Sequence, residues 1–598
     1  MPAGSNTTVL LERPVPGPVR GSSEFPPASP VTPVARRGDS ELGSRSERWW
    51  RHPAIPCALL AVLLVANLPI VVCRPLGPDP VLYDLQARVL LEGGTLYRDI
   101  IEPNLPGVVA VHALVRSVAG WSPLALRVAD LLIVGSVIWL LSAWVQRLRK
   151  LEGLAVEHDS RAGPVWLAVV LTWFYLSLTE SQTCQRDLWT LLPVLTAMTL
   201  RWYRVHTSFG EHLPRGRFVW GAVIEGVLWA IACWIKPQVV IPGGLVVLVS
   251  TLIHRRRSPA LLDIGSVLLG GGLFTASVID WMVHSGTWPH FVEMMTEWNP
   301  QYFQHGRRLW SVEKLLSSYR FFSPLSLGVP VALLLTAPTL ASGLRKRKPC
   351  PSAEADVLLV TLFIGWTLQA VLLQNTFAYV QLPVVVLAVT TLWRLLPRFP
   401  RLGTLVIPAA IAAVLMAMPG RAATNRDQLA AWPACLREGP TTAVQQRVQL
   451  DHYPDRGELA TVTNYLRTLD LRDGDLTTFN LNLVHMYAEL RLRPSTRYVF
   501  TDILAHIFRD RAGVIEDALQ TSGQRFVVSS LTENGLAADV VAALDDDPAA
   551  FEPLLTAETL GEFPYNQTVI HRTGQYVVHR VDQPVGRLCL GIRKSTGN

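Results

Sequence analysis

Long apolar runs separated by short basic connections dominate the first two thirds of the chain. A helix needs about 20 apolar residues to cross a bilayer, and these runs approach or reach that length. The pattern predicts a polytopic α-helical membrane protein with about eleven transmembrane helices. The expected spans are 54–73, 124–145, 165–178, 188–202, 218–235, 239–253, 261–283, 325–344, 357–373, 377–393 and 402–418.

One further apolar segment, 105–118, decides the topology. It is too short to cross, and we expect it to lie as a helix in the membrane interface. With this segment non-spanning, every short Lys/Arg cluster falls on the cytoplasmic side, as the positive-inside rule requires. With it spanning, the clusters after residue 145 fall outside. The sequence therefore predicts a multi-pass protein of the plasma (inner) membrane with a cytoplasmic N-terminus and an external C-terminus.

The two ends of the chain differ from the apolar region. Residues 1–48 are rich in Pro, Ser, Gly and Arg, which is typical of a disordered cytoplasmic segment. Residues 421–598 mix charged residues with short apolar runs and predict an external α/β domain, which leaves 49–420 as the membrane domain. In the C-terminal part we expect helices at 457–469 and 512–519, and strands at 476–479, 526–529, 568–571 and 576–581.

Composition agrees with a membrane protein. The 598 residues are 49% hydrophobic and 17% charged, with a formal net charge of +7. The basic excess lies mainly in short loops, where it sets topology, so it does not indicate nucleic acid binding. The seven cysteines show no metal-ligand spacing. Cys435 and Cys589 both lie in the external part, and a disulfide between them stays open at this point.

The first external loop, 74–107, is long for such a protein and rich in acids. Apolar residues at helical spacing predict an amphipathic helix over 81–91 that ends at Glu92-Gly93-Gly94. Asp79 is expected in the N-cap region of this helix, where backbone N–H groups hold a carboxylate. Asp79 is thus either a simple helix cap or a positioned catalytic acid.

The loop resembles the first external loop of the GT-C glycosyltransferases, in the branch of the protein O-mannosyltransferases and the lipid A aminoarabinose transferase. The matching positions are Asp79, Tyr83, Ala87, Arg88, Leu91 and the step Asn104-Leu105-Pro106-Gly107. The chain departs from the family at Pro80, often a second acid, and at Asn104, where a Lys-Pro-Pro step is usual. The resemblance implies inverting sugar transfer from a polyprenyl-phosphate donor on the external face, with Asp79 as general base.

Other external residues fit this chemistry. Tyr83, one helical turn after Asp79, could orient the base or line the sugar pocket. The resemblance implies a second-loop acid near Asp79, for which Asp187 is our choice and Glu180 the alternative. Arg186 between them either binds substrate or forms an interfacial ion pair.

Further candidates contact the donor in this interpretation. Lys236, at an external membrane boundary, either grips a lipid phosphate or snorkels to the interface. Arg88 on the interfacial helix could face the same phosphate, and Asn104 occupies the family's lysine position. The family's late-span pattern, an aromatic and a polar residue before Leu-Pro, carries over to Tyr379 and Gln381.

Some questions stay open at the sequence level. A long external loop, 284–322, holds residues that could bind a divalent metal ion or could form a polar cover over the site: His284, His290, Glu293, Glu297 and His305. No other cofactor is indicated. The expected partners are the polyprenyl-phosphate sugar, membrane lipid, and a glycan, lipid or protein acceptor. The alternatives are a polytopic transporter or lipid flippase, and an inactive scaffold on a GT-C-like fold.

The topology has a direct test. With cysteine introduced at Ser181 or Arg345, a membrane-impermeant maleimide should label Ser181→Cys in intact cells and Arg345→Cys only after the membrane is opened. Labelling of both positions from the same side would contradict the eleven-span topology.

Overall fold

Helices make up most of the chain in the computed structural model, which describes residues 52–152, 159–207, 214–254, 260–345, 350–374, 377–396, 425–451, 453–546 and 551–592. Residues 50–598 form one unit by their contacts. The expected segment 1–48 and the eleventh span, 402–418, lie outside the described residues. The domain boundary near residue 420 also lies there and stays a prediction.

Seven described helices are long and apolar enough, by length and composition, to cross a membrane. They are α1 (Ala54–Cys73), α4 (Pro123–Leu151), α8 (Arg215–Ile235), α10 (Ala260–His284), α14 with the turn before it (Leu325–Arg345), α15 (Pro351–Leu373) and α16 with the turn before it (Ala378–Leu395). Shorter helices complete the bundle: α5 (Asp159–Leu176), α6 (Arg186–Trp189), α7 (Leu191–Thr207) and α9 (Val240–His254). The polytopic helical class is confirmed, whereas the count of eleven spans stays a prediction.

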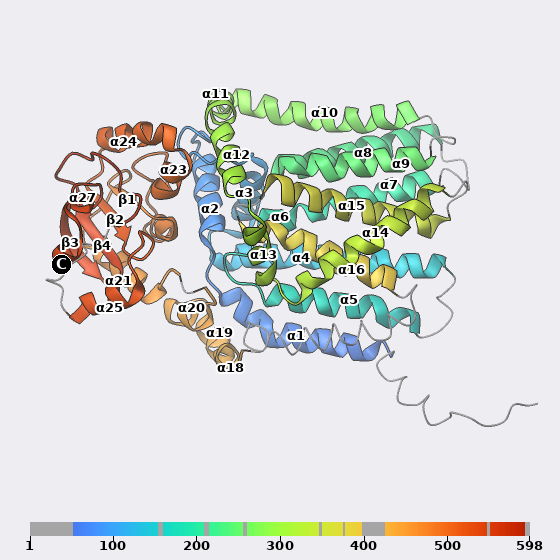
Figure 1. Ribbon diagram of the computed structural model, residues 1–598, viewed down its shortest axis with the longest axis horizontal. Helices are drawn as coiled ribbons and strands as arrows, with labels where there is room; N and C mark the ends of the chain where they lie inside the picture. Colours follow the sequence, from blue (N-terminus) through green and yellow to red (C-terminus); the bar gives the residue numbers. More distant parts are fainter. Residues whose placement is uncertain are drawn as a thin grey trace, which may run out of the picture. The chain divides into compact units, whose positions relative to one another are not determined.

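The bundle helices lie side by side with roughly parallel axes, and several short helices cross one end of the bundle (Figure 1). The crossing helices are α2 (Pro78–Leu91), α3 (Gly107–Ala119), α11 (Trp288–Glu293), α12 (Asn299–Arg308) and α13 (Val312–Phe321). The expected surface helix is therefore present, although it begins at Pro78 rather than at residue 81. The segment 284–322, expected as a long external loop, folds into helices, because its apolar residues recur at helical spacing.

The C-terminal part contains the predicted small sheet, with strand order β1-β2-β4-β3. β1 (Leu476–Thr478) pairs parallel with β2 (Phe526–Ser530), and β4 (Tyr576–Arg580) runs antiparallel to β2 and to β3 (Thr568–Thr573). The helices of this part are α18 (Arg426–Ala430), α19 (Trp432–Glu438), α20 (Thr442–Val448), α21 (Arg456–Arg467), α22 (His485–Leu490), α23 (Thr501–Ile507), α24 (Ala512–Thr521), α25 (Ala538–Asp546), α26 (Phe551–Leu554) and α27 (Ala557–Leu560). Of these, α21 contacts β3 and β4, whereas α18, α19 and α20 pack against α1 (Figure 1). All four strands and both helices expected here are confirmed.

Two cysteines that could have paired lie apart. Cys435 of α19 packs with Cys73 of α1 in one apolar cluster, whereas Cys589 belongs to a different cluster. Neither takes part in a disulfide bond. The structure therefore does not support a disulfide between Cys435 and Cys589.

Four charged side chains inside the bundle neutralise one another. Arg201 and Arg204 of α7 each contact both Glu225 of α8 and Asp263 of α10, at nitrogen–oxygen distances of 2.5–3.0 Å. All four side chains are 6% exposed or less. A single charge in lipid is costly, so Glu225 requires partners, and this cluster supplies them. The cluster joins three helices and has no net charge.

Removal of one acid should therefore destabilise the bundle. Glu225→Gln leaves two buried guanidinium groups short of a carboxylate, and breaking a buried pair costs about 3–5 kcal/mol. We expect a lower apparent Tm for the purified protein in detergent. Glu313→Gln, on the exposed face of α13, is the matched control and should leave the apparent Tm unchanged. Equal apparent Tm values for both variants would contradict this account of the cluster.

Candidate functional site

Two buried arginines fasten the first external loop to the second. Arg127 of α4 donates to Thr183 Oγ1 at 2.6 Å and to the carbonyl oxygen of Pro75. Arg74 donates to the carbonyl oxygen of Leu178 at 3.1 Å. Both arginines are no more than 1% exposed, so these oxygens provide the solvation that water would otherwise give. These hydrogen bonds thereby hold the first residues of the two loops together.

Gly77 lies where the two loops approach most closely. A Cβ atom built at this position would lie 2.8 Å from the carbonyl oxygen of Glu180, so a larger residue would push the loops apart. Gly77 also precedes α2, which begins at Pro78. Asp79 therefore lies inside the first turn of the helix, and its predicted place at the N-cap is wrong by two residues.

Asp79 meets residues from the second loop and from the start of α16. Gln185 Nε2 donates to Asp79 Oδ2 at 3.4 Å, and Tyr379 also hydrogen-bonds this carboxyl group. Burial raises the pKa of Asp79 above its ordinary range, and Arg186 opposes this shift only in part. The side chain keeps some exposure. A carboxylate with a raised pKa is a stronger proton acceptor at neutral pH.

Arg186 carries an unused hydrogen-bond donor. Its side chain is 12% exposed, and its buried Nη1 has no hydrogen-bond partner among the described residues. Asp187 is 4.0 Å from Arg186 Nε but forms its closest ion pair with Lys236, and both of those side chains are 1% exposed. Arg186 is therefore free to bind an anion through Nη1, whereas Lys236 already has a carboxylate partner.

A second hydrogen-bonded group surrounds Asn104. Its side-chain nitrogen donates to Glu102 and, at 3.2 Å, to the hydroxyl of Tyr83, and its carbonyl oxygen accepts from Tyr97 at 2.8 Å. Burial raises the pKa of Glu102 to about 8, although Arg186 opposes this. Glu102 is therefore mainly protonated and uncharged at pH 7.

A cavity of about 160 Å³ lies beside these groups. Its wall has a polar part and an apolar part. The polar part consists of Asn104, Arg186, Asp187, Gln238, Asn299, Tyr302, Gln374 and Tyr379. The apolar part consists of Pro103, Leu105, Pro237, Met295, Phe303, Gly306, Leu373, Phe377 and Val380. Asp79 is not in the wall but adjoins it through Tyr379. Such a wall suits a ligand with a polar head and a hydrocarbon tail.

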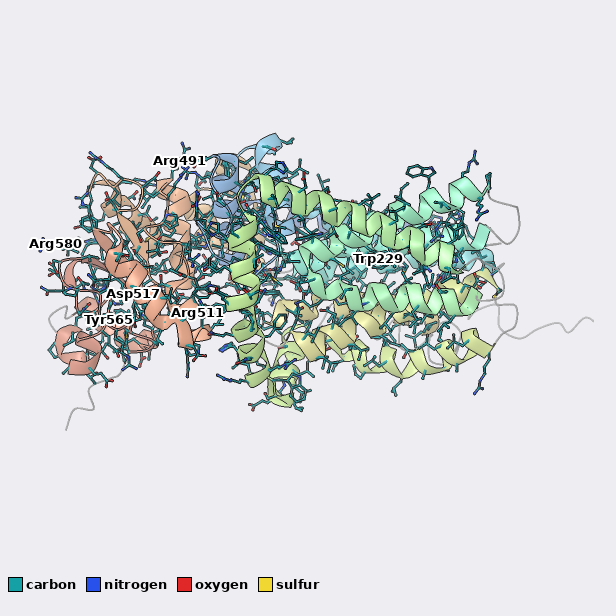
Figure 2. All side chains as sticks on the ribbon, turned by 90° about the horizontal axis from the view of Figure 1, so that it is seen from above. Trp229, Arg491, Arg511, Asp517, Tyr565 and Arg580 are labelled. Atoms are coloured by element: carbon teal, nitrogen blue, oxygen red, sulfur yellow. The ribbon has the colours of Figure 1, made fainter. Side chains whose placement is uncertain are left out.

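Two predicted site residues lie at the junction with the C-terminal domain. Arg88 pairs with Glu92 at 2.8 Å and donates to the carbonyl oxygen of Arg491, on the side of that domain next to α2 (Figure 2). Glu180 accepts hydrogen bonds from the backbone nitrogen atoms of Leu450 and Asp451 at 2.8–3.1 Å. Neither lines the cavity.

Gln381 does not line the cavity either. It is 1% exposed, and its side-chain oxygen accepts a hydrogen bond from Tyr319 of α13 at 3.1 Å. It therefore anchors α13 to the start of α16. Tyr379, two residues earlier, stacks on Phe377 at 5.3 Å between ring centres and lines the cavity itself.

Three residues of the site were not predicted from the sequence: Glu102, Asn299 and Tyr302. Glu102 is one of several acids in the first loop, and no role was assigned to it. Asn299 and Tyr302 lie in the segment 284–322, where the candidates were His and Glu residues that could bind a metal ion. The signal that could have found them is helical periodicity, because Met295, Asn299, Tyr302 and Gly306 recur every three or four residues.

The predicted metal candidates are spread along α10 to α12. Glu293 and Glu297 pair with arginines of the C-terminal domain, and His305 lies 5.8 Å from His506 between ring centres. His284 hydrogen-bonds the carbonyl oxygen of Asp280. Across the described ranges, no group of three or more His, Cys, Asp or Glu residues is placed to hold a metal ion.

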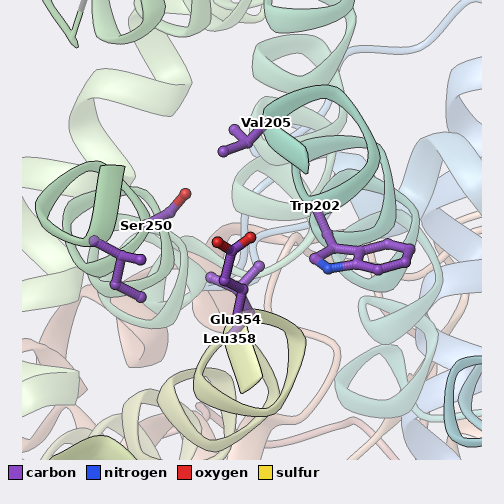
Figure 3. A pocket seen from close by; sticks show the side chains of 6 residues that line it. Trp202, Val205, Ser250, Glu354 and Leu358 are labelled. Atoms are coloured by element: carbon purple, nitrogen blue, oxygen red, sulfur yellow. The ribbon is translucent and has the colours of Figure 1, made fainter. Parts of the chain in front are cut away.

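A second, much smaller cavity lies among α7, α9 and α15 (Figure 3). Its volume is about 10 Å³, with Trp202, Ser250 and Glu354 in its wall. That is room for about one water molecule, so it does not fit a substrate.

No protein-family model and no curated protein matches this chain. Solved structures do show similarity. ArnT from Cupriavidus metallidurans bound to undecaprenyl phosphate is 15% identical, with 89% of this chain and 99% of that chain covered and a TM-score of 0.47. The oligosaccharyltransferase AglB from Archaeoglobus fulgidus, in complex with an inhibitory peptide and a dolichol-phosphate, is 13% identical over 92% and 77%, with a TM-score of 0.45.

Both proteins are GT-C glycosyltransferases, the class that the first external loop resembles. The identities lie below 25% and the TM-scores below 0.5. The assignment of a function therefore depends on the geometry of the site.

The pKa of Glu102 leads to a prediction about stability. Glu102 keeps its proton up to about pH 8 in the folded protein, whereas a glutamate in the unfolded chain has its ordinary pKa of 4.5. Stability should therefore fall as pH rises from 4.5 to 8 and then level off. Glu102→Gln cannot lose this proton, so its apparent Tm should fall less than that of the unmodified protein between pH 5 and pH 8.

Glu92→Gln is the control, because Arg88 first and then Arg493 lower the pKa of Glu92. This variant should keep the decline. Parallel pH profiles for the unmodified protein and Glu102→Gln would show that Glu102 is charged at neutral pH.

Proposed function

We propose that the chain is an integral membrane glycosyltransferase that transfers a sugar from a polyprenyl-phosphate carrier to an acceptor on the external face, with inversion at the anomeric carbon. The observation that carries this proposal is that Tyr379 and Arg186 line one cavity, whose wall contains both polar and apolar side chains, and that Asp79 adjoins this cavity through Tyr379. The acceptor provides a hydroxyl group and belongs to a glycan, a lipid or a protein.

Asp79 acts as the general base. The acceptor oxygen forms a bond to the anomeric carbon while the bond from that carbon to the phosphate oxygen breaks. The acceptor proton passes to Asp79, and the polyprenyl phosphate leaves with its negative charge. Attack from the face opposite the phosphate inverts the anomeric centre. Gln185 and Tyr379 hold the carboxylate in place through the hydrogen bonds described above.

Arg186 binds the phosphate of the donor. Its Nη1 is buried and unpaired, which is costly unless an anion binds there. Asp187, expected as the second catalytic acid, acts in this arrangement by fixing Lys236 beside the same phosphate. Arg186 thus supplies the cation that the family places at the position of Asn104. This supports an active enzyme over an inactive scaffold.

The apolar wall accommodates the first part of the lipid tail. Leu373 and Phe377 are at least 37% exposed at the end of α15 and before α16, and Met295 and Phe303 are similarly exposed on the opposite side. Tyr83 and Asn104 face the sugar between this wall and the base. The proposed donor thereby places its phosphate at Arg186 and its sugar near Asp79.

The transporter alternative has one feature in its favour, the four charges inside the bundle. Transporters commonly place acids near the membrane midplane as ion sites. Here all four carboxylate oxygens of Glu225 and Asp263 accept from arginine nitrogens. These oxygens are already neutralised, which favours a structural role.

The central test is turnover of labelled donors by Asp79→Asn. Purified full-length protein in lipid nanodiscs would be incubated with a panel of radiolabelled polyprenyl-phosphate sugars and an extract of envelope glycans and lipids. Asparagine keeps the shape of the side chain but cannot accept the proton. We expect kcat to fall by about 10²–10⁴-fold, with the donor KM changed by less than about threefold.

Asp99→Asn is the matched control from the same loop, because Asp99 pairs with Arg98 away from the cavity. It should keep normal turnover. Near-normal turnover of Asp79→Asn beside an inactive Asp187→Asn would move the base to the second loop. The absence of turnover with every donor would contradict the proposed function.

A further inference from the structure

The helical stretch that covers the cavity has two functional faces. It consists of a π-helical turn (Met294–Trp298) followed by α12, and it supplies Met295, Asn299, Tyr302 and Phe303 to the cavity wall. Trp298, which immediately precedes Asn299, is 1% exposed and does not line the cavity. Its ring instead packs against the C-terminal domain.

Four residues of the C-terminal domain enclose Trp298, and we call them the Trp298 socket: Arg497, Tyr498, Phe508 and Arg511. The ring centre of Trp298 lies 5.0 Å from that of Phe508, in an edge-to-face arrangement, and 5.6 Å from that of Tyr498. The guanidinium carbons of Arg511 and Arg497 lie 5.1 Å and 6.0 Å from the same ring centre. Aromatic pairs and cation–π contacts of this kind are directional, so they fix the ring's orientation.

The same two arginines form ion pairs with two glutamates that precede Trp298 in the chain. Arg497 binds Glu293 through two nitrogens, at 2.6 Å and 3.2 Å, and Arg511 binds Glu297 at 2.8 Å. Figure 2 shows Arg511 at the edge of the C-terminal domain next to these helices. The helical stretch is therefore attached to the C-terminal domain through three residues: Glu293, Glu297 and Trp298.

Arg497 also contacts the first loop, which supplies Asn104 to the cavity wall. Its carbonyl oxygen accepts from the backbone nitrogen of Ile101 at 2.9 Å, and its Nη1 lies 3.5 Å from the carbonyl oxygen of Tyr97. Tyr97 in turn hydrogen-bonds the backbone of Asn104. One residue of the C-terminal domain thus contacts two of the segments that contribute to the cavity wall.

Neighbouring residues of this stretch serve two faces because successive side chains of a helix lie about 100° apart around its axis. Trp298 enters the socket, while Asn299, the next residue, lines the cavity. The π-helical turn that ends at Trp298 contains one more residue than an α-helical turn, and such turns are frequent at functional sites.

We propose that Trp298 and Arg497 are positioning residues of the donor cavity, through which the C-terminal domain sets how tightly the cavity closes on its ligand. Neither residue touches the reacting atoms. Replacement of either residue makes the helical stretch 294–308 more mobile and weakens donor binding. Asp79 and the contact between Arg186 and the phosphate stay in place. This inference rests on the proposed function for its kinetic consequences but not for its structural ones.

The test uses charge reversal in the full-length protein in nanodiscs, with two readouts. Arg497→Glu should accelerate backbone hydrogen–deuterium exchange in peptides covering 294–308 by about tenfold and should raise the donor KM by about tenfold, with kcat within about twofold. The double variant Arg497→Glu with Glu293→Arg restores an ion pair and should recover most of both values. Trp298→Phe keeps an aromatic ring in the socket and should be milder than Trp298→Ala.

Arg509→Ala is the matched control, because Arg509 is an exposed arginine of the same segment. It should leave both readouts unchanged. Unchanged exchange at 294–308 in Arg497→Glu and Trp298→Ala would overturn the proposal, as would a fall in kcat that the double variant does not restore. Hydrogen–deuterium exchange tests the proposal even if no donor is turned over. A failure of this proposal is therefore distinguishable from a failure of the proposed function.

Discussion

Guanidinium groups buried at one end of a helix bundle require oxygen acceptors, and the site of this protein depends on which oxygens they bind. Arg74 and Arg127 bind carbonyl oxygens from two loops that are about 100 residues apart in sequence. Satisfying these two cations brings the first turn of α2 against the second loop. Without that constraint, Asp79 and Arg186 would have no fixed separation, and the cavity would have no defined polar end.

Much of the fold follows from the sequence because its signals are local. The first span and the strands of the C-terminal sheet match their predicted positions closely, since each depends on a run of residues with one period. The stretch around α12 was missed for an equally physical reason. Its many charged and aromatic residues resemble a solvated loop, although they divide between the face that lines the cavity and the face that meets the C-terminal domain.

The candidate site was less predictable than the fold. Tyr379 lies 300 positions after Asp79, and no spacing rule connects them; only the resemblance to a family suggested that both belong to one site. Glu225 illustrates the same limit. Its need for a partner follows from the cost of a charge in lipid, but the identity of Arg201 and Arg204 as partners depends on how α7, α8 and α10 pack.

The four-charge cluster of α7, α8 and α10 also constrains how the chain enters the membrane. A helix with two unpaired arginines leaves the aqueous insertion machinery only at a large cost, but its partners Glu225 and Asp263 follow within about 60 residues of chain. These helices therefore gain by partitioning into the lipid together, after the last of them has been synthesised. The pairing of these charges thus links the membrane integration of α7, α8 and α10 to their packing against one another.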